Sequence, residues 1–89
     1  MHRLELTSRA QRELEKLGEG EFGRILEAMQ RLRDNPRPAG VRKLRGPIYR
    51  IRSGNWRIVY AVFDKDQLVI VGKVARRAED TYDKVDELF

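Results

Sequence analysis

The opening residues alternate between apolar and charged positions, which is typical of a short strand. Leu4 and Leu6 fall on one side of the chain, and charged residues fall between them. Ala10 and Leu14 then repeat with helical spacing, and Ser8 stands where a helix-capping residue is expected. The pattern therefore predicts a strand followed by a first helix.

A second apolar stripe with helical spacing follows a glycine-containing link. Gly18 is placed to end the first helix as a C-terminal cap. Apolar residues then recur every three or four positions from Phe22 to Leu32. Asn35 and Pro36 stop this helix, because the residue before a proline is pushed out of the helical region. We expect the two helices to form an antiparallel hairpin.

The hydrophobic period changes from helical to alternating in the second half of the chain. Residues 36–47 are rich in proline and glycine and predict a loop. Three alternating segments predict a meander of strands joined by short turns, over residues 48–52, 56–63 and 68–75. Residues 56–63 form an apolar run that predicts a central strand. Residues 79–88 predict a short last helix.

The predicted element order is β-α-α-β-β-β-α, which indicates a single α+β domain over residues 1–89. A strand, a helical hairpin, a three-stranded antiparallel meander and a short C-terminal helix make up this domain. Because each helix has only one apolar stripe, the hairpin is expected to pack on one face of the sheet.

Charge is distributed unevenly along the 89 residues. The formal net charge is +5, and arginine outnumbers lysine by 14 to 5, a bias that favours bidentate contacts with phosphate. Residues 35–63 hold seven basic residues and no acidic one, whereas residues 78–89 hold one basic and five acidic residues. This distribution predicts a surface that faces a polyanion, with nucleic acid as the first candidate. The alternative interpretation is a solvated basic loop.

The residues that the chain lacks exclude several classes of function. Without cysteine there is no disulfide, thiolate zinc site or cysteine nucleophile. The single histidine, His2, argues against a Ser-His-Asp triad and against a histidine-rich metal site. No apolar run approaches the roughly 20 residues that cross a bilayer, and no signal peptide opens the chain. We expect a cytoplasmic protein with no membrane association, no metal and no small-molecule cofactor.

Arginines cluster on the predicted meander. Arg50 and Arg52 are two residues apart and must share one face of their strand. A short turn brings Arg57 within cross-strand reach of Arg52, and Arg76 and Arg77 close the third strand. Like charges side by side on strands are destabilising, so the cluster implies an anionic ligand whose binding offsets the repulsion.

A phosphodiester of RNA suits such a cluster, because arginines stabilise the negative charge that develops on phosphate during cleavage. RNA also supplies its own nucleophile, the 2′-hydroxyl. Tyr82 is expected to stack on a base or contact the sugar, or alternatively to pack the last helix against the sheet. Trp56 falls on the apolar side of its strand, which indicates a packing role.

Several short motifs, in their order and spacing, resemble the RelE/ParE superfamily of bacterial toxins. The motifs are Lys43-Leu44-Arg45-Gly46, Tyr49-Arg50-Ile51-Arg52, Trp56-Arg57-Ile58-Val59-Tyr60 and Val74-Ala75-Arg76-Arg77, followed by Tyr82. The resemblance covers nearly the whole chain. It implies the toxin of a type II toxin–antitoxin pair, whose protein partner is the cognate antitoxin.

RelE-like members of this superfamily cut messenger RNA in the ribosomal A site, without metal, by 2′-hydroxyl attack that leaves a cyclic phosphate. The resemblance therefore implies the ribosome and messenger RNA as further partners. It implies catalytic roles for basic residues of the meander and a late tyrosine: Arg50, Arg52, Arg57, Arg76 and Tyr82. It also implies RNA contacts by Lys43, Arg45 and Arg77.

This chain departs from the RelE-like pattern on the first meander strand. RelE-like enzymes often carry lysines there, whereas this chain has Arg50 and Arg52. Arginine is a poor general base because its pKa lies above about 12, so proton abstraction is left to Tyr82 or to water.

Other functions compatible with the superfamily stay open. A ParE-like toxin would bind and poison DNA gyrase without cutting nucleic acid. A plain RNA-binding module, or a toxin that has lost its activity, is a further alternative. The acidic tail has two interpretations as well: a solvated helix face, or a latch on or near the basic surface. An antitoxin segment would dock on the apolar side of this latch or displace it; that side consists of Tyr82, Val85, Leu88 and Phe89.

Overall fold

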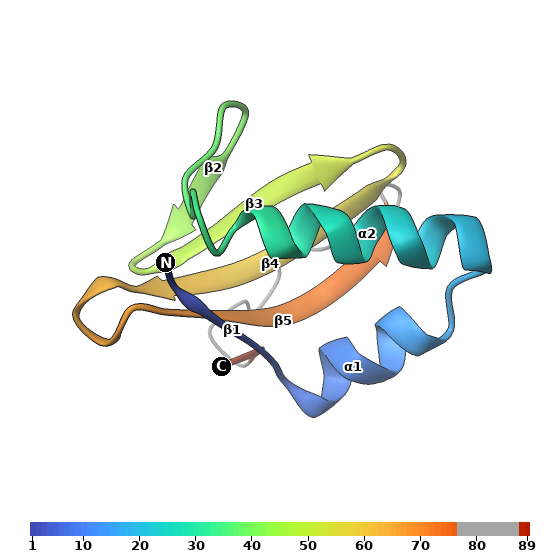
Figure 1. The fold of residues 1–89 in the computed structure, drawn as a ribbon, viewed down its shortest axis with the longest axis horizontal. Helices are drawn as coiled ribbons and strands as arrows, with labels where there is room; N and C mark the ends of the chain where they lie inside the picture. Colours follow the sequence, from blue (N-terminus) through green and yellow to red (C-terminus); the bar gives the residue numbers. More distant parts are fainter. Residues whose placement is uncertain (77–87) are drawn as a thin grey trace.

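A five-stranded mixed sheet carries two helices on one of its faces (Figure 1). The computed structural model describes residues 1–76 and 88–89. Its elements, in chain order, are β1 (Arg3–Leu6), α1 (Ser8–Glu15), α2 (Glu19–Arg31), β2 (Arg42–Arg45), β3 (Ile48–Ser53), β4 (Trp56–Phe63), a 3-10 turn (Asp64–Asp66) and β5 (Leu68–Arg76). The strand order across the sheet is β1-β5-β4-β3-β2, so the apolar strand β4 is central, as its sequence predicts.

The predicted α+β class, with its opening strand, helical hairpin and meander, is confirmed. Strand β1 pairs in parallel with β5, and the other neighbouring strands are antiparallel. The prediction of a loop over residues 36–47 is wrong for Arg42–Arg45, which form β2 beside β3. Three of the four residues of β2 are charged, and a bulge interrupts its register. The sequence therefore has no apolar alternation that would predict this strand. The predicted helix over residues 79–88 lies outside the described residues except for Leu88.

The ends of the two helices differ from the prediction by one to three residues. Thr7, and not Ser8, caps α1, because its hydroxyl accepts a hydrogen bond of 3.2 Å from the backbone N–H of Ala10. Helix α1 ends at Glu15, and Gly18 stands at the N-terminal cap of α2 with an extended backbone. In the described part of the chain no helix is long and apolar enough to cross a membrane.

The main hydrophobic core lies between the helices and the sheet. Each helix contributes its predicted stripe, and strands β3, β4 and β5 contribute the residues that point toward the helices. The buried members are Ala10, Leu14, Ile25, Met29, Leu32, Ile51, Ile58, Tyr60, Val62, Val69, Val71 and Val74. Burial of this apolar surface is the main force that holds the hairpin on the sheet.

A smaller apolar cluster lies on the opposite face of the sheet, away from the helices. It consists of Ile48, Val59 and Ala61, and Leu88 packs against it. Phe89 lies over Gly72, where a Cβ would come within 2.7 Å of the phenyl ring. The last two residues therefore sit on the face of the sheet opposite α1 and α2.

Candidate nucleic-acid interface

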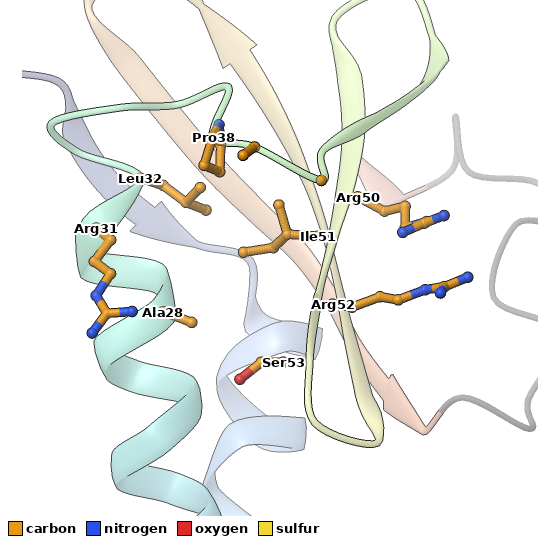
Figure 2. A pocket seen from close by; sticks show the side chains of 10 residues that line it. Ala28, Arg31, Leu32, Pro38, Arg50, Ile51, Arg52 and Ser53 are labelled. Atoms are coloured by element: carbon orange, nitrogen blue, oxygen red, sulfur yellow. The ribbon is translucent and has the colours of Figure 1, made fainter.

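Three arginines project from the face of the sheet opposite α1 and α2. Arg52 and Arg57 stand directly opposite each other on β3 and β4, and directly opposite residues of antiparallel strands share one face. Arg50 lies two residues before Arg52 and shares that face. Figure 2 shows both β3 arginines pointing away from the helices, on the opposite side of the strand from Ile51. The predicted grouping of the three is thus present, and we call this side of the sheet the arginine face.

Two further basic residues, which the sequence did not single out, belong to the arginine face. Arg42 of β2 is directly opposite Arg50, and Lys73 of β5 is directly opposite Val59. Simple alternation from Val69 and Val71 would place Lys73 toward the helices. A register shift between β4 and β5 turns it to the other face, and Gly72 is the one signal in the sequence for such an irregularity.

Arg50 is buried although it carries a charge. Only 6% of its surface is exposed, and its buried Nε has no hydrogen-bond partner among the residues that the structure describes. The four antiparallel strands contain no acidic residue that could neutralise it. A desolvated cation is costly unless it is compensated, so among the residues that the structure describes this position favours an anion brought by a ligand.

Arg76 is not brought beside the other three arginines. It is directly opposite Trp56, which in turn is opposite Ser53, so it belongs to the face that the helices cover. Its guanidinium carbon lies 5.2 Å from the centre of the Trp56 ring, a cation–π contact. Tyr82, the remaining candidate catalytic residue, lies outside the described residues.

The residues expected to contact RNA are divided between the two faces. Lys43 is opposite Tyr49 on the helix-covered side, whereas Arg45 is opposite Ile48 and so belongs to the arginine face. Arg77 falls outside the described residues. Both described side chains are exposed at the β2 edge of the sheet, where a long ligand can reach them.

One arginine of the basic block has a structural role that the sequence did not reveal. Arg37 donates two hydrogen bonds to the carboxylate of Asp64, of 2.9 and 3.3 Å, and a third from Nε to the hydroxyl of Tyr49, of 3.0 Å. Its guanidinium also lies over the Tyr49 ring, 5.1 Å from the ring centre. His2 contacts the same carboxylate at 3.2 Å. We call Arg37, Tyr49, Asp64 and His2 the loop clasp.

The loop clasp shifts the acidity of its members. The hydrogen bond from Arg37, and then that from His2, lowers the pKa of Asp64 below its ordinary value. Nearby, burial raises the pKa of Tyr60, whose hydroxyl donates a hydrogen bond of 2.6 Å to the carbonyl of Pro36. These contacts fasten the segment before β2 to the sheet.

The chemistry that the arginine face can perform follows from its donors. Guanidinium groups donate hydrogen bonds and stabilise negative charge, but they do not accept a proton at neutral pH. Within residues 1–76 and 88–89, no group of three histidine, aspartate or glutamate side chains is arranged to hold a metal ion. The face is therefore suited to binding a phosphate chain and to stabilising charge that develops on it.

Comparisons with known proteins give a consistent result. A family model for the ParE toxin of the type II toxin–antitoxin system parDE matches residues 4–81. A Methanocaldococcus jannaschii protein described as a candidate toxin, RelE1, is 29% identical over 79 residues, which cover 83% of this chain and 88% of that protein.

Solved structures of RelE proteins share the fold. RelE in the archaeal RelE–RelB complex from Pyrococcus horikoshii superposes with a TM-score of 0.80 at 28% identity, over 88% of this chain and 97% of that one. The isolated RelE toxin of E. coli superposes with a TM-score of 0.77 at 27% identity, over 91% of this chain and 89% of that one. A chain of the RelBE2 toxin–antitoxin complex of Mycobacterium tuberculosis superposes with a TM-score of 0.75 at 26% identity, over 88% of this chain and 93% of that one.

Proposed function

Because the chain belongs to the family of ParE toxins of type II toxin–antitoxin systems and has the fold of RelE toxins, we propose that it is an endoribonuclease that cuts messenger RNA in the ribosomal A site. Residues 1–89 act as one toxin domain in the cytoplasm. The observation that supports this activity best is the arginine face, where Arg50, Arg52 and Arg57 adjoin without any acidic residue on the four antiparallel strands.

The reaction needs no metal in this proposal, because the RNA supplies the nucleophile. The 2′-oxygen attacks the neighbouring phosphorus while its proton passes to Tyr82 or to water. The bond from phosphorus to the 5′-oxygen breaks, which leaves a 2′,3′-cyclic phosphate and a 5′-hydroxyl that takes up a proton. Arg52 and Arg57 stabilise the charge on the non-bridging oxygens, and the buried Arg50 fixes the position of the phosphate.

The other candidate residues act at the border of this site. Arg76 contacts the phosphate or the leaving oxygen, which requires its guanidinium to leave the ring of Trp56. Tyr82 contacts base or sugar. Lys43, Arg45 and Arg77 hold the RNA backbone on either side.

A cognate antitoxin is the proposed protein partner. Structures with the same fold include complexes of RelE with RelB, such as that of Pyrococcus horikoshii. On this chain the apolar cluster of Ile48, Val59 and Ala61, with Leu88 against it, lies on the same face of the sheet as the arginines. An antitoxin segment that takes the place of Leu88 would cover the arginine face.

One observation favours a second candidate function. The matching family model is that of ParE, so a non-nucleolytic toxin that inhibits DNA gyrase is the alternative. Such a toxin does not need a phosphate site, and the buried guanidinium of Arg50 would then have no purpose.

Induced expression without antitoxin separates the two functions. Primer extension on cellular transcripts is expected to show new 5′ ends, aligned with codons, within minutes of induction. Intact messenger RNA together with gyrase-linked DNA breaks would overturn the nuclease in favour of the gyrase inhibitor.

A further inference from the structure

A groove opens on the helix-covered side of the molecule, between α2 and the free edge of β3. Its volume is about 490 Å³, within the range of roughly 300–1,000 Å³ that is usual for ligand sites. Figure 2 shows Ala28 of α2 and Leu32, the C-terminal cap of this helix, facing Ile51 and Ser53 of β3 across it, with Pro38 closing one end. We call this space the hairpin groove, because it runs along the β3–β4 hairpin.

Arg31 lines the helical rim of the hairpin groove, and Arg24 continues the same side of α2 toward the tip of the hairpin. Arg24, Ala28 and Arg31 follow one side of α2, with two turns of about 10 Å between the two arginines. Nη1 of Arg24 lies 3.4 Å from the place that a Cβ would take on Gly54, at the tip of the hairpin. The side chain of Arg31 is 76% exposed and forms an ion pair with Glu27, four residues earlier on the helix.

An aromatic ring stands near the hairpin tip on the same side. Trp56 packs one part of its indole against the main core and carries the exposed guanidinium of Arg76 on another. Ser53, directly opposite Trp56, also lines the groove. When the guanidinium of Arg76 moves to the phosphate, the face of the indole that it covered can take a nucleobase, since aromatic planes are the usual platforms for single-stranded RNA.

The hairpin groove and the arginine face adjoin at one strand. Strand β2 lies beside β3 only from Ile48 to Arg50, so beyond that point β3 alone separates the two surfaces. At Arg52 the backbone lines the groove, and the side chain projects to the arginine face (Figure 2). A single strand of nucleic acid that crosses this edge would have one phosphate beside Arg52 and its next nucleotides in the groove.

We infer that the hairpin groove binds the single-stranded RNA that flanks the cleaved phosphate, with bases in the apolar groove and phosphates on Arg24 and Arg31. This inference rests on the proposed nuclease function. The two arginines favour an anionic occupant, which would take the place of Glu27 at Arg31, and an acidic peptide would also satisfy this condition. The indole face beneath Arg76 favours a ligand with planar bases. A strand stacked at about 3.4 Å per nucleotide places several phosphates along the roughly 10 Å between the two arginines.

The test measures binding separately from cleavage. The probe is a ten-nucleotide 2′-O-methyl RNA, which cannot supply the nucleophile, and the readout is the fluorescence of Trp56, the only tryptophan in the chain. Stacking is expected to quench this fluorescence. Arg24→Gln and Arg31→Gln should each weaken binding about two- to fivefold and reduce the log–log salt slope by about 0.7. Arg12→Gln, an exposed arginine on α1, is the matched control and should bind as the wild type does.

Three results would overturn the inference. The first is that both groove variants bind the RNA as Arg12→Gln does, while Arg57→Ala abolishes cleavage. The nuclease proposal would then hold without an RNA site in the groove. The second is unquenched Trp56 fluorescence at saturating RNA. The third is that the groove variants bind an acidic peptide more weakly than the wild type does, while their affinity for RNA is unchanged. If the wild type cuts no RNA but the groove variants bind it more weakly, the groove holds RNA and the nuclease proposal fails.

Discussion

Two regions of this protein place an arginine in opposite surroundings. In the loop clasp, Arg37 has a carboxylate, a phenol hydroxyl and an aromatic ring as partners. On the arginine face, Arg50 is 6% exposed and its Nε has no partner among the described residues. The first arginine is satisfied by the fold, whereas the four antiparallel strands offer the second no counter-charge, and a ligand would supply one. Net charge alone does not distinguish these two roles.

The largest effect is expected for Arg50→Met, which keeps the volume of the side chain and removes its charge. Cleavage in programmed ribosomes should fall about 100-fold or more, because one stabilising donor of the developing charge is lost. The free energy of unfolding should stay the same or rise, since a buried cation without a partner is costly. Urea denaturation measures the second quantity. A large loss of stability in Arg50→Met would show that the fold needs the charge of Arg50, as it uses that of Arg37 in the loop clasp.

In contrast to Arg50→Met, Tyr60→Phe should lower the stability of the fold and leave cleavage intact. Removing the buried hydroxyl leaves the carbonyl of Pro36 without its donor, which costs about 1–3 kcal/mol of the free energy of unfolding. Cleavage per folded molecule should not change. Tyr49→Phe is the control, because the Tyr49 hydroxyl is exposed and its loss should cost less. Equal stability of Tyr60→Phe and the wild type would show that this hydrogen bond does not hold the segment before β2.

The smallest effect concerns the pH dependence of the loop clasp. Arg37 and then His2 lower the pKa of Asp64 from its ordinary value of 3.8. The ionised carboxylate therefore stabilises the folded chain above pH 3.8, and this contribution is lost as the pH falls through the lowered pKa. Asp64→Asn should be less stable than the wild type near neutral pH and lose this difference in acid. Urea midpoints of the wild type and Asp64→Asn, measured at a series of pH values, test this expectation. A difference in midpoint that stays constant with pH would contradict it.

Much of the fold follows from hydrophobic periodicity. Patterns within each segment predict the two helices and the central position of β4. The short turn between two neighbouring strands predicts that Arg52 lies opposite Arg57. Strand β2 could not be predicted in this way, because its charged residues pair with β3 through backbone groups and leave no apolar pattern.

The candidate site was predictable only where the sheet is regular. Alternation places Arg50 and Arg52 on one face, but the register shift beside Gly72 brings Lys73 to the same face against simple alternation. Arg37 could not be separated from the other arginines, since its partner Asp64 is 27 residues away along the chain. The contact of Arg76 with Trp56 likewise depends on a pairing between distant strands.

The central claim is that the arginine face holds the phosphate that is cut. Single-turnover cleavage of messenger RNA in programmed ribosomes, by Arg57→Ala with Arg12→Ala as the matched control, tests it most directly. The account predicts a rate at least about 100-fold lower for Arg57→Ala and an unchanged rate for Arg12→Ala, with both variants folded. Cleavage by Arg57→Ala at the rate of the wild type would contradict it.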